Sequence, residues 1–210
     1  MRFVRLVLAS LLSLAATGFA AYAEPVTYKI DPGHSQVGFS IRHFFSKVPG
    51  RFNEFEGAIL HDDKNPANSS VEVTIKTGSI YTNNDRRDGH LKSADFFAAD
   101  SFPAMTFKST KVTPGTDGKM KVDGNLTIRG VTRPVTLDAT FLGAGAISIG
   151  GQAMGQRAGW EATTRVNRKD FNILWNKTLD HGGTMLGDEV AIALGIEAVK
   201  RDSAAAGAGK

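Results

Sequence analysis

The chain has 210 residues, no cysteine and a formal net charge of +4 at pH 7. The lack of cysteine excludes disulfides, thiol catalysis and thiolate metal sites, so an ordinary hydrophobic core must stabilise the fold. The basic residues are interleaved with acidic ones along the chain, which argues against a nucleic-acid-binding protein. The length suffices for one domain.

Residues 1–23 have the order of a secretory signal peptide. Arg2 and Arg5 precede an apolar run from Leu6 to Ala16, and the small residues of Ala21-Tyr22-Ala23 follow. This run is too short to span a bilayer. We therefore expect cleavage after Ala23, export to a bacterial periplasm, and a mature protein without a transmembrane segment.

From residue 24 to residue 201, apolar and polar residues alternate in many short runs, the period of half-buried β-strands. Turn residues such as Pro32-Gly33 and Pro114-Gly115 separate these runs at hairpin spacing. The runs expected as strands are Val26–Ile30, Ser35–Phe45, Arg51–Leu60 and residues 71–76, 105–112, 120–128, 135–141, 160–166 and 189–200. We predict one all-β domain over residues 24–201 and a disordered Ala/Gly-rich tail over residues 202–210.

Two segments depart from the strand period. Residues 143–155 are rich in Gly and Ala and fit either a loop or the ends of two strands. Residues 86–107 begin with cationic side chains and continue into a cluster of Phe residues. We predict a short helical cap here. A charged cap that leads into an apolar cluster suits an amphiphilic ligand, although most Phe clusters are simply core.

The pattern gives about eight or nine strands and favours an up-and-down antiparallel barrel over a sandwich. A closed sheet lets each strand bury one face without leaving an exposed edge. A barrel of this size is either filled by its side chains or wide enough to hold one small ligand. The alternation of residues leaves both options open.

No pattern predicts a catalytic or metal site. A Gly-x-Ser-x-Gly motif and a phosphate-binding glycine loop are both absent, and the five histidines form no His-x-His or His-x-x-x-His pair. We expect no cofactor and no catalysis. What the residues offer is a binding site for a hydrophobic small molecule inside the barrel.

In such a site, the guanidinium of Arg87 and the imidazole of His90 would meet a polar head group at the cavity mouth. The alternative is a solvated helix whose arginines pair with Asp85 and Asp88. The candidate ligand-binding residues are Phe39, Ile41, His43, Phe55, Arg87, His90, Leu91, Phe96, Phe97, Phe107, Phe141, Trp160 and Trp175.

Several segments, in order along the chain, resemble the YceI-like family. The match is strongest at Arg87–Phe97, Phe102–Phe107 and Gly124–Val135, and it extends from Tyr28–Ser35 to Arg168–Phe171 and the last strand. The resemblance implies an extended, lipocalin-like antiparallel barrel of eight strands in the periplasm, whose cavity binds polyisoprenoids, isoprenoid quinones or fatty amides. It also implies a link to stress responses, the option of a homodimer and no established catalysis. The Gly/Ala-rich residues 143–159 depart from the family pattern.

Three hypotheses follow from these observations. The first is a carrier that sequesters a long-chain amphiphile in the cavity. The second is a structural or interaction module whose barrel is filled by its own side chains. The third is a lipid-acting enzyme, which would need a polar pair within the cavity, with His90 or His43 beside a carboxylate.

Overall fold

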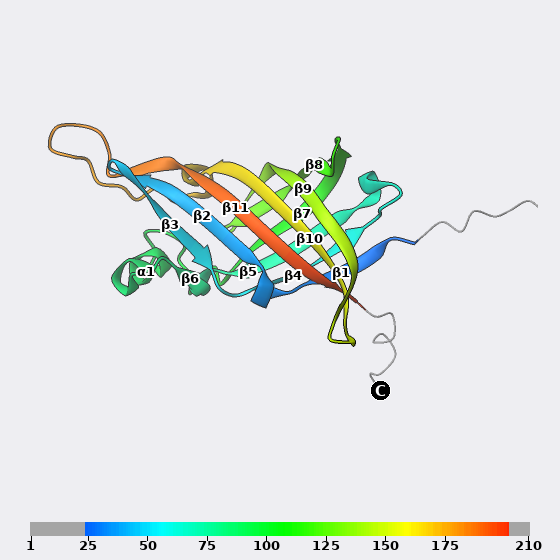
Figure 1. The fold of residues 1–210 in the computed structure, drawn as a ribbon. Helices are drawn as coiled ribbons and strands as arrows, with labels where there is room; N and C mark the ends of the chain where they lie inside the picture. The colour runs from blue at the N-terminus through cyan, green and yellow to red at the C-terminus, as the bar shows by residue number, and fades with distance from the viewer. Residues whose placement is uncertain (1–23, 202–210) are drawn as a thin grey trace, which may run out of the picture.

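Eleven strands make up most of residues 24–201, the part of the chain that the computed structural model describes (Figure 1). The expected signal peptide, residues 1–23, and the expected tail, residues 202–210, lie outside the described residues. The strands are β1 (Val26–Ile30), β2 (Gln36–His43), β3 (Ser46–Phe52), β4 (Phe55–His61), β5 (Ser70–Lys76), β6 (Ile80–Tyr81), β7 (Ala104–Pro114), β8 (Lys119–Ile128), β9 (Val131–Ile149), β10 (Gln152–Asn167) and β11 (Leu186–Lys200). The helical segments are α1 (Asp85–Lys92) and the 3₁₀ turns η1 (Pro32–His34), η2 (Pro66–Asn68), η3 (Thr77–Ser79) and η4 (Arg168–Phe171).

These strands follow eight antiparallel paths around a closed barrel. β1 and β2 lie end to end along β11, and β4 and β3 lie end to end beside them. β5 and β6 continue this pattern beside β4 and β3. β7 to β11 then follow in chain order, and the pairing of β11 with β1 closes the ring. The predicted eight-stranded antiparallel barrel is therefore confirmed.

The break between β1 and β2 has a local cause. Pro32 has no backbone N–H for a sheet, and its ring fixes a backbone angle that suits the first turn of a helix. The Asp31 side chain accepts a hydrogen bond from the Gly33 amide at 3.1 Å. The resulting turn η1 divides the first path, so that β1 pairs with one end of β11 and β2 with the rest.

Two glycines make room for aromatic rings on neighbouring strands. Gly50 on β3 is the register partner of Phe39, and a Cβ atom on Gly50 would lie 2.3 Å from Cζ of that ring. A Cβ atom on Gly124 in β8 would lie 2.4 Å from Cζ of Phe107. Each ring therefore covers bare backbone on the adjacent strand, which lets a large side chain fit inside a small barrel.

The Gly/Ala-rich segment proves to be the ends of two strands, one of the two expected alternatives. β9 continues to Ile149, β10 begins at Gln152, and Gly150 and Gly151 form the turn with φ angles of 58° and 83°. In Figure 1 this hairpin extends past the body of the barrel. Large apolar side chains are exposed near its tip, including Ile147, Ile149 and Met154.

The two ends of the barrel differ. Helix α1, the β2–β3 hairpin and the connection from η4 to β11 gather at one end, here called the cap end (Figure 1). The path formed by β3 and β4 starts at the cap end and finishes at His61, at the opposite end, here called the far end. The predicted helical cap is thus present as α1. Within residues 24–201, no helix is both long enough and apolar enough to span a membrane.

Candidate ligand-binding site

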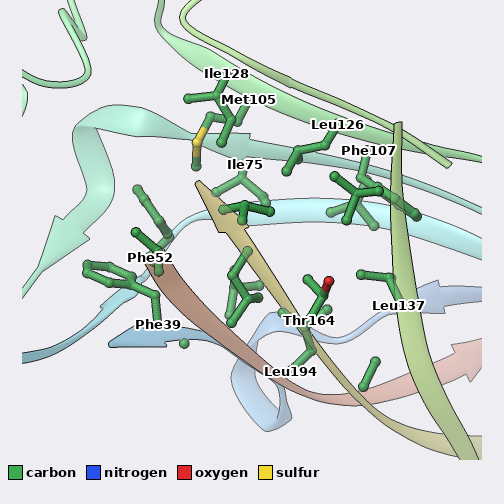
Figure 2. Close-up of a pocket in the computed structure, with 18 of the residues that line it drawn as sticks. Phe39, Phe52, Ile75, Met105, Phe107, Leu126, Ile128, Leu137, Thr164 and Leu194 are labelled. Carbon is green, nitrogen blue, oxygen red and sulfur yellow. The ribbon is translucent and has the colours of Figure 1, made fainter. Parts of the chain in front are cut away.

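The inward faces of the strands surround a cavity of about 390 Å³. Figure 2 shows inward side chains from several strands, among them Phe39, Phe107 and Leu194, converging on this space. Inward residues such as Ile192 and Leu194 are only half-buried, because they face the cavity and not another layer of side chains. A volume of this order lies within the usual range of small-molecule pockets, roughly 300–1,000 Å³.

With the exception of Phe141, every residue predicted for the site lines this cavity. Those residues are Phe39, Ile41, His43, Phe55, Arg87, His90, Leu91, Phe96, Phe97, Phe107, Trp160 and Trp175. Phe141 lies just behind the wall at the far end, with its ring 4.4 Å from the ring of His61. The fold thus brings together residues from distant segments, and their contact with a ligand stays a prediction.

The cationic side chain of the cap is held by a neighbouring threonine. Arg87 donates from Nε to Thr82 Oγ1 and from Nη2 to the Thr82 carbonyl oxygen, both at 2.7 Å. The buried carboxylate of Asp88 in turn accepts hydrogen bonds from the backbone amide and the hydroxyl of Thr82. Asn84 caps α1 by accepting a hydrogen bond from the Arg87 amide. Arg87 is therefore fixed at the mouth through Thr82, and not by the direct pairing with Asp85 or Asp88 that the alternative interpretation expected.

Three aromatic rings close the cap end behind Arg87. The His90 ring lies edge-on to Phe96 at 5.0 Å and to Trp175 at 4.8 Å, and Phe96 and Trp175 are 5.2 Å apart. Nε2 of His90 is hydrogen-bonded to Asp95 Oδ2 at 2.8 Å. This cluster joins the segment after α1 to the connection after η4, so the cap end depends on two parts of the chain that are far apart in sequence.

Arg168 is a buried residue of this end that the sequence patterns did not identify. Its side chain lines the cavity and donates to the carbonyl oxygens of Gly187, Ile173 and Trp175. It also pairs with Asp188 at 3.2 Å. Burial lowers the pKa of this guanidinium, and Asp188 opposes the shift. The contacts show a structural role: Arg168 holds the connection against β11. Its position inside a motif of charged residues gave no sign of burial.

The far end holds a second residue that sequence reasoning missed. The strand expected over Arg51–Leu60 stops short of His61, but His61 is the last residue of β4 and is 7% exposed. Its ring packs against Phe141 at 4.4 Å and Trp160 at 5.7 Å. Burial lowers the pKa of His61, although the nearby carboxylates of Asp63 and Asp62 oppose the shift. The imidazole is therefore neutral near pH 7.

A third polar cluster lies outside the cavity. Side-chain ligand atoms of Asp31, His34 and Glu197 lie close together near the junction of β1 and β2. Arg157 Nη1 donates to both carboxylates, at 2.9 Å to Asp31. The hydrogen bond from His34, followed by that from Arg157, lowers the pKa of Asp31. An arginine thus occupies the place between the acids, so we assign the cluster to the stability of the barrel seam.

A family model for the YceI-like domain matches residues 28–198 of the chain. A YceI protein of Salmonella arizonae is 43% identical over 191 residues, which cover 90% of this chain and 93% of that protein. A UPF0312 protein of Enterobacter sp. (strain 638) is 42% identical over 194 residues, again 90% of this chain and 93% of the relative.

Solved structures show the same barrel. The crystal structure of a Campylobacter jejuni YceI protein has a TM-score of 0.65 and 30% identity, and covers 77% of this chain and 90% of its own. Burkholderia cenocepacia BcnA has a TM-score of 0.71 at 24% identity, over 81% of this chain and 99% of its own. A polyisoprenoid binding domain from Saccharophagus degradans has a TM-score of 0.59 at 14% identity, over 84% and 99%. The last two likenesses concern the fold alone. The family match and the identities above 40% lead to one conclusion: this chain belongs to the YceI-like family.

Proposed function

We propose that this protein binds one long-chain amphiphile of the isoprenoid class inside its barrel and carries or sequesters it in the periplasm. The observation that carries the proposal is the cavity itself, an apolar space that runs from the cap residues Arg87 and His90 to His61 at the far end. A filled barrel would leave its inward side chains fully buried, whereas Ile192 and Leu194 are not.

The shape and chemistry of the cavity select for a chain more than for a compact polar ligand. Each methylene group that leaves water contributes about 0.8 kcal/mol. A tail of many carbons therefore supplies most of the affinity, and a polar end group mainly fixes its orientation. A structural neighbour described as a polyisoprenoid binding domain supports the isoprenoid class.

The periplasmic location rests on the leader sequence, and the link to stress responses follows from the family resemblance. Residues 1–23 have the charged, apolar and small-residue order of an exported leader. A homodimer is a further proposal that follows from the family resemblance.

The alternative of a lipid-acting enzyme has one observation in its favour, the hydrogen bond between His90 and Asp95 at the cavity wall. A general base oriented by a carboxylate has this arrangement. However, the hydroxyl of Ser93 donates to the His90 carbonyl oxygen and not to its ring. Turnover of a polyprenyl substrate by the wild type that is lost in His90→Ala would favour the enzyme.

The experiment that tests the binding proposal is native mass spectrometry of the mature protein isolated from its own periplasm. Organic extraction and identification of the released compound follow. A stoichiometric long-chain isoprenoid is the expected result. A ligand-free mass together with an extract that contains no lipid would favour the filled-barrel module, and the same spectrum reports whether the protein is a dimer.

A further inference from the structure

The far end of the cavity contains a buried polar atom without a partner. Among the buried side-chain nitrogen and oxygen atoms of residues 24–201, Nε2 of His61 is the one that makes no hydrogen bond. Native proteins pair most such atoms, since leaving one unpaired costs about 1–3 kcal/mol. An unpaired nitrogen on the wall of a binding cavity therefore points to a group that enters with a ligand.

His61 lies in the wall of the cavity, where neighbouring side chains cover its Nε2 atom, so an end group of a ligand reaches this atom when those side chains move aside. The His61 side chain lines the cavity, and the rings of Phe141 and Trp160 pack against the imidazole. The nearest carboxylate oxygen, on Asp63, lies 3.9 Å from Nε2, beyond hydrogen-bond distance, and its side chain is 79% exposed. The carboxylate of Asp62 accepts hydrogen bonds from backbone amides of its own loop. Neither acid satisfies Nε2.

Four polar side chains elsewhere in the cavity wall are already paired, and His43 and Ser70 are partly or fully exposed, so water can reach them. Arg87 is held by Thr82, and His90 by Asp95. Arg168 is bonded to carbonyl oxygens and Asp188, and Thr164 donates to the Thr136 carbonyl oxygen at 2.8 Å. A ligand group at these positions must displace a bond that exists. At His61 it adds a bond where there was none, so the far end offers the larger gain.

We propose that His61, between Phe141 and Trp160, is a polar anchor that receives an uncharged hydroxyl or carbonyl end group of the long-chain ligand, whose chain then runs toward the cap. This proposal rests on the proposed lipid-binding function and adds the orientation of the ligand and the chemistry of its end group. The neutral imidazole can donate to a carbonyl or accept from a hydroxyl, depending on its tautomer. A charged head group such as a phosphate is disfavoured, because the aromatic wall would remove it from water without a countercharge.

A pair of matched ligands tests the anchor. Geranylgeraniol and the hydrocarbon that lacks only its hydroxyl differ in nothing that the apolar wall can recognise. The free energy of transfer from water alone predicts a certain ratio between the affinities for the two ligands. We expect the wild type to bind the alcohol roughly threefold to tenfold more tightly than this ratio predicts, because one buried hydrogen bond contributes about that much affinity. In His61→Phe this extra preference disappears, whereas His61→Gln, which keeps a donor and an acceptor, retains it. His181→Phe, a matched change at an exposed histidine that does not line the cavity, should leave the preference as in the wild type.

The two tryptophans of the chain report the orientation directly, because Trp160 lies at the far end and Trp175 at the cap. A long-chain alcohol with bromine at its other end is added to the single-tryptophan variants Trp160→Phe and Trp175→Phe. If the hydroxyl reaches His61, the bromine quenches Trp175 and spares Trp160. This measurement uses native His61 and stands even if His61→Phe does not fold.

Each outcome decides one of the two proposals. Quenching of Trp160 in place of Trp175, or an alcohol preference that survives in a folded His61→Phe, would overturn the anchor and leave lipid binding intact. Failure of both the alcohol and the hydrocarbon to bind the wild type would overturn the proposed function, and the anchor with it.

Discussion

Arg168 and His61 are buried polar side chains in the wall of one cavity, and their surroundings give them opposite roles. Arg168 is 4% exposed and donates to three carbonyl oxygens and one carboxylate. His61 is 7% exposed, and its Nε2 atom has no partner. A fully paired group stabilises its surroundings, whereas an unpaired one is free to recognise a ligand.

Replacing Arg168 by Met should destabilise the fold strongly. The carbonyl oxygens of Ile173 and Trp175 would lose their donor in a buried site, and Asp188 would lose one of its two cationic partners. We expect a loss of about 3 kcal/mol in the free energy of unfolding, measured by urea denaturation. The matched variant Arg165→Met removes an exposed pair with Glu189 and should have a much smaller effect. Equal losses in the two variants would contradict the role assigned to Arg168.

The buried imidazole of His61 should make the fold sensitive to mild acid. Burial lowers its pKa in the folded state, so below the ordinary value of about 6.5 the unfolded chain binds more protons than the folded one. Stability therefore falls as the pH drops through that value. The lowered pKa values of Asp31 and Asp188 act in a separate window, because the stability that they confer is present above the ordinary value of 3.8 and is lost only as the pH falls further.

The measurement is the urea midpoint at pH 7.5 and pH 5.5. We expect the urea midpoint to be lower at pH 5.5 than at pH 7.5 in the wild type and in the exposed control His181→Phe. The decrease should be smaller in His61→Phe. An identical fall in all three proteins would show that another group causes the acid sensitivity.

At the scale of the strands, close contact between aromatic rings and glycine backbone sets what the barrel interior can hold. Phe39 and Phe107 fit because Gly50 and Gly124 carry no side chain beneath them. The outward extension of β9 and β10 has no such constraint, and a Cβ atom on Gly145 would meet no atom within 4 Å. The same residue type thus has different importance inside the barrel and beyond it.

Gly124→Ala should therefore lower the free energy of unfolding more than Gly145→Ala does. The new Cβ atom would lie 2.4 Å from the Phe107 ring and 2.7 Å from the Lys108 carbonyl oxygen, so strand or ring must move. We expect a loss of about 1–3 kcal/mol for Gly124→Ala, as for other overpacked cores, and little change for Gly145→Ala. Thermal unfolding of both variants checks this. A neutral Gly124→Ala would mean that the ring moves into the cavity at no cost.

For the whole molecule, the important quantity is the space left inside the closed ring. Ala139 on β9 and its register partner Ala162 on β10 both line the cavity. The small size of these two residues keeps the middle of the barrel open between the aromatic groups at its two ends. Ligand capacity therefore belongs to the assembled ring and to no single strand.

Ala139→Trp should lower ligand occupancy while the barrel still forms, because the indole would fill part of a cavity of about 390 Å³. Ala193→Trp is the matched control, since Ala193 is exposed and does not line the cavity. Native mass spectrometry after expression to the periplasm gives the occupied fraction. Unchanged occupancy in a folded Ala139→Trp protein would place the ligand outside the barrel.

Local sequence patterns predict much of this fold. The two-residue alternation of β5, the turn at Pro32-Gly33 and the interruption at α1 are each decided by neighbouring residues, and each was predicted from the sequence. The inward aromatic residues followed from the same alternation, because in a strand every second side chain faces one side. The family resemblance added the number of strands and the expected ligand class.

Tertiary structure decided what depends on pairs of segments distant along the chain. Whether the barrel is filled or hollow is set by the summed volumes of side chains from all eight paths, which no single strand contains. Arg168 is satisfied only because the chain returns to place three carbonyl oxygens around it. His61 has a polar sequence context that indicates a loop, yet the register of β4 with β1 places it inside the barrel, beside Phe141 and Trp160. Local sequence determines where the strands form. The closure of the ring determines which side chains meet and leaves Nε2 of His61 without a partner.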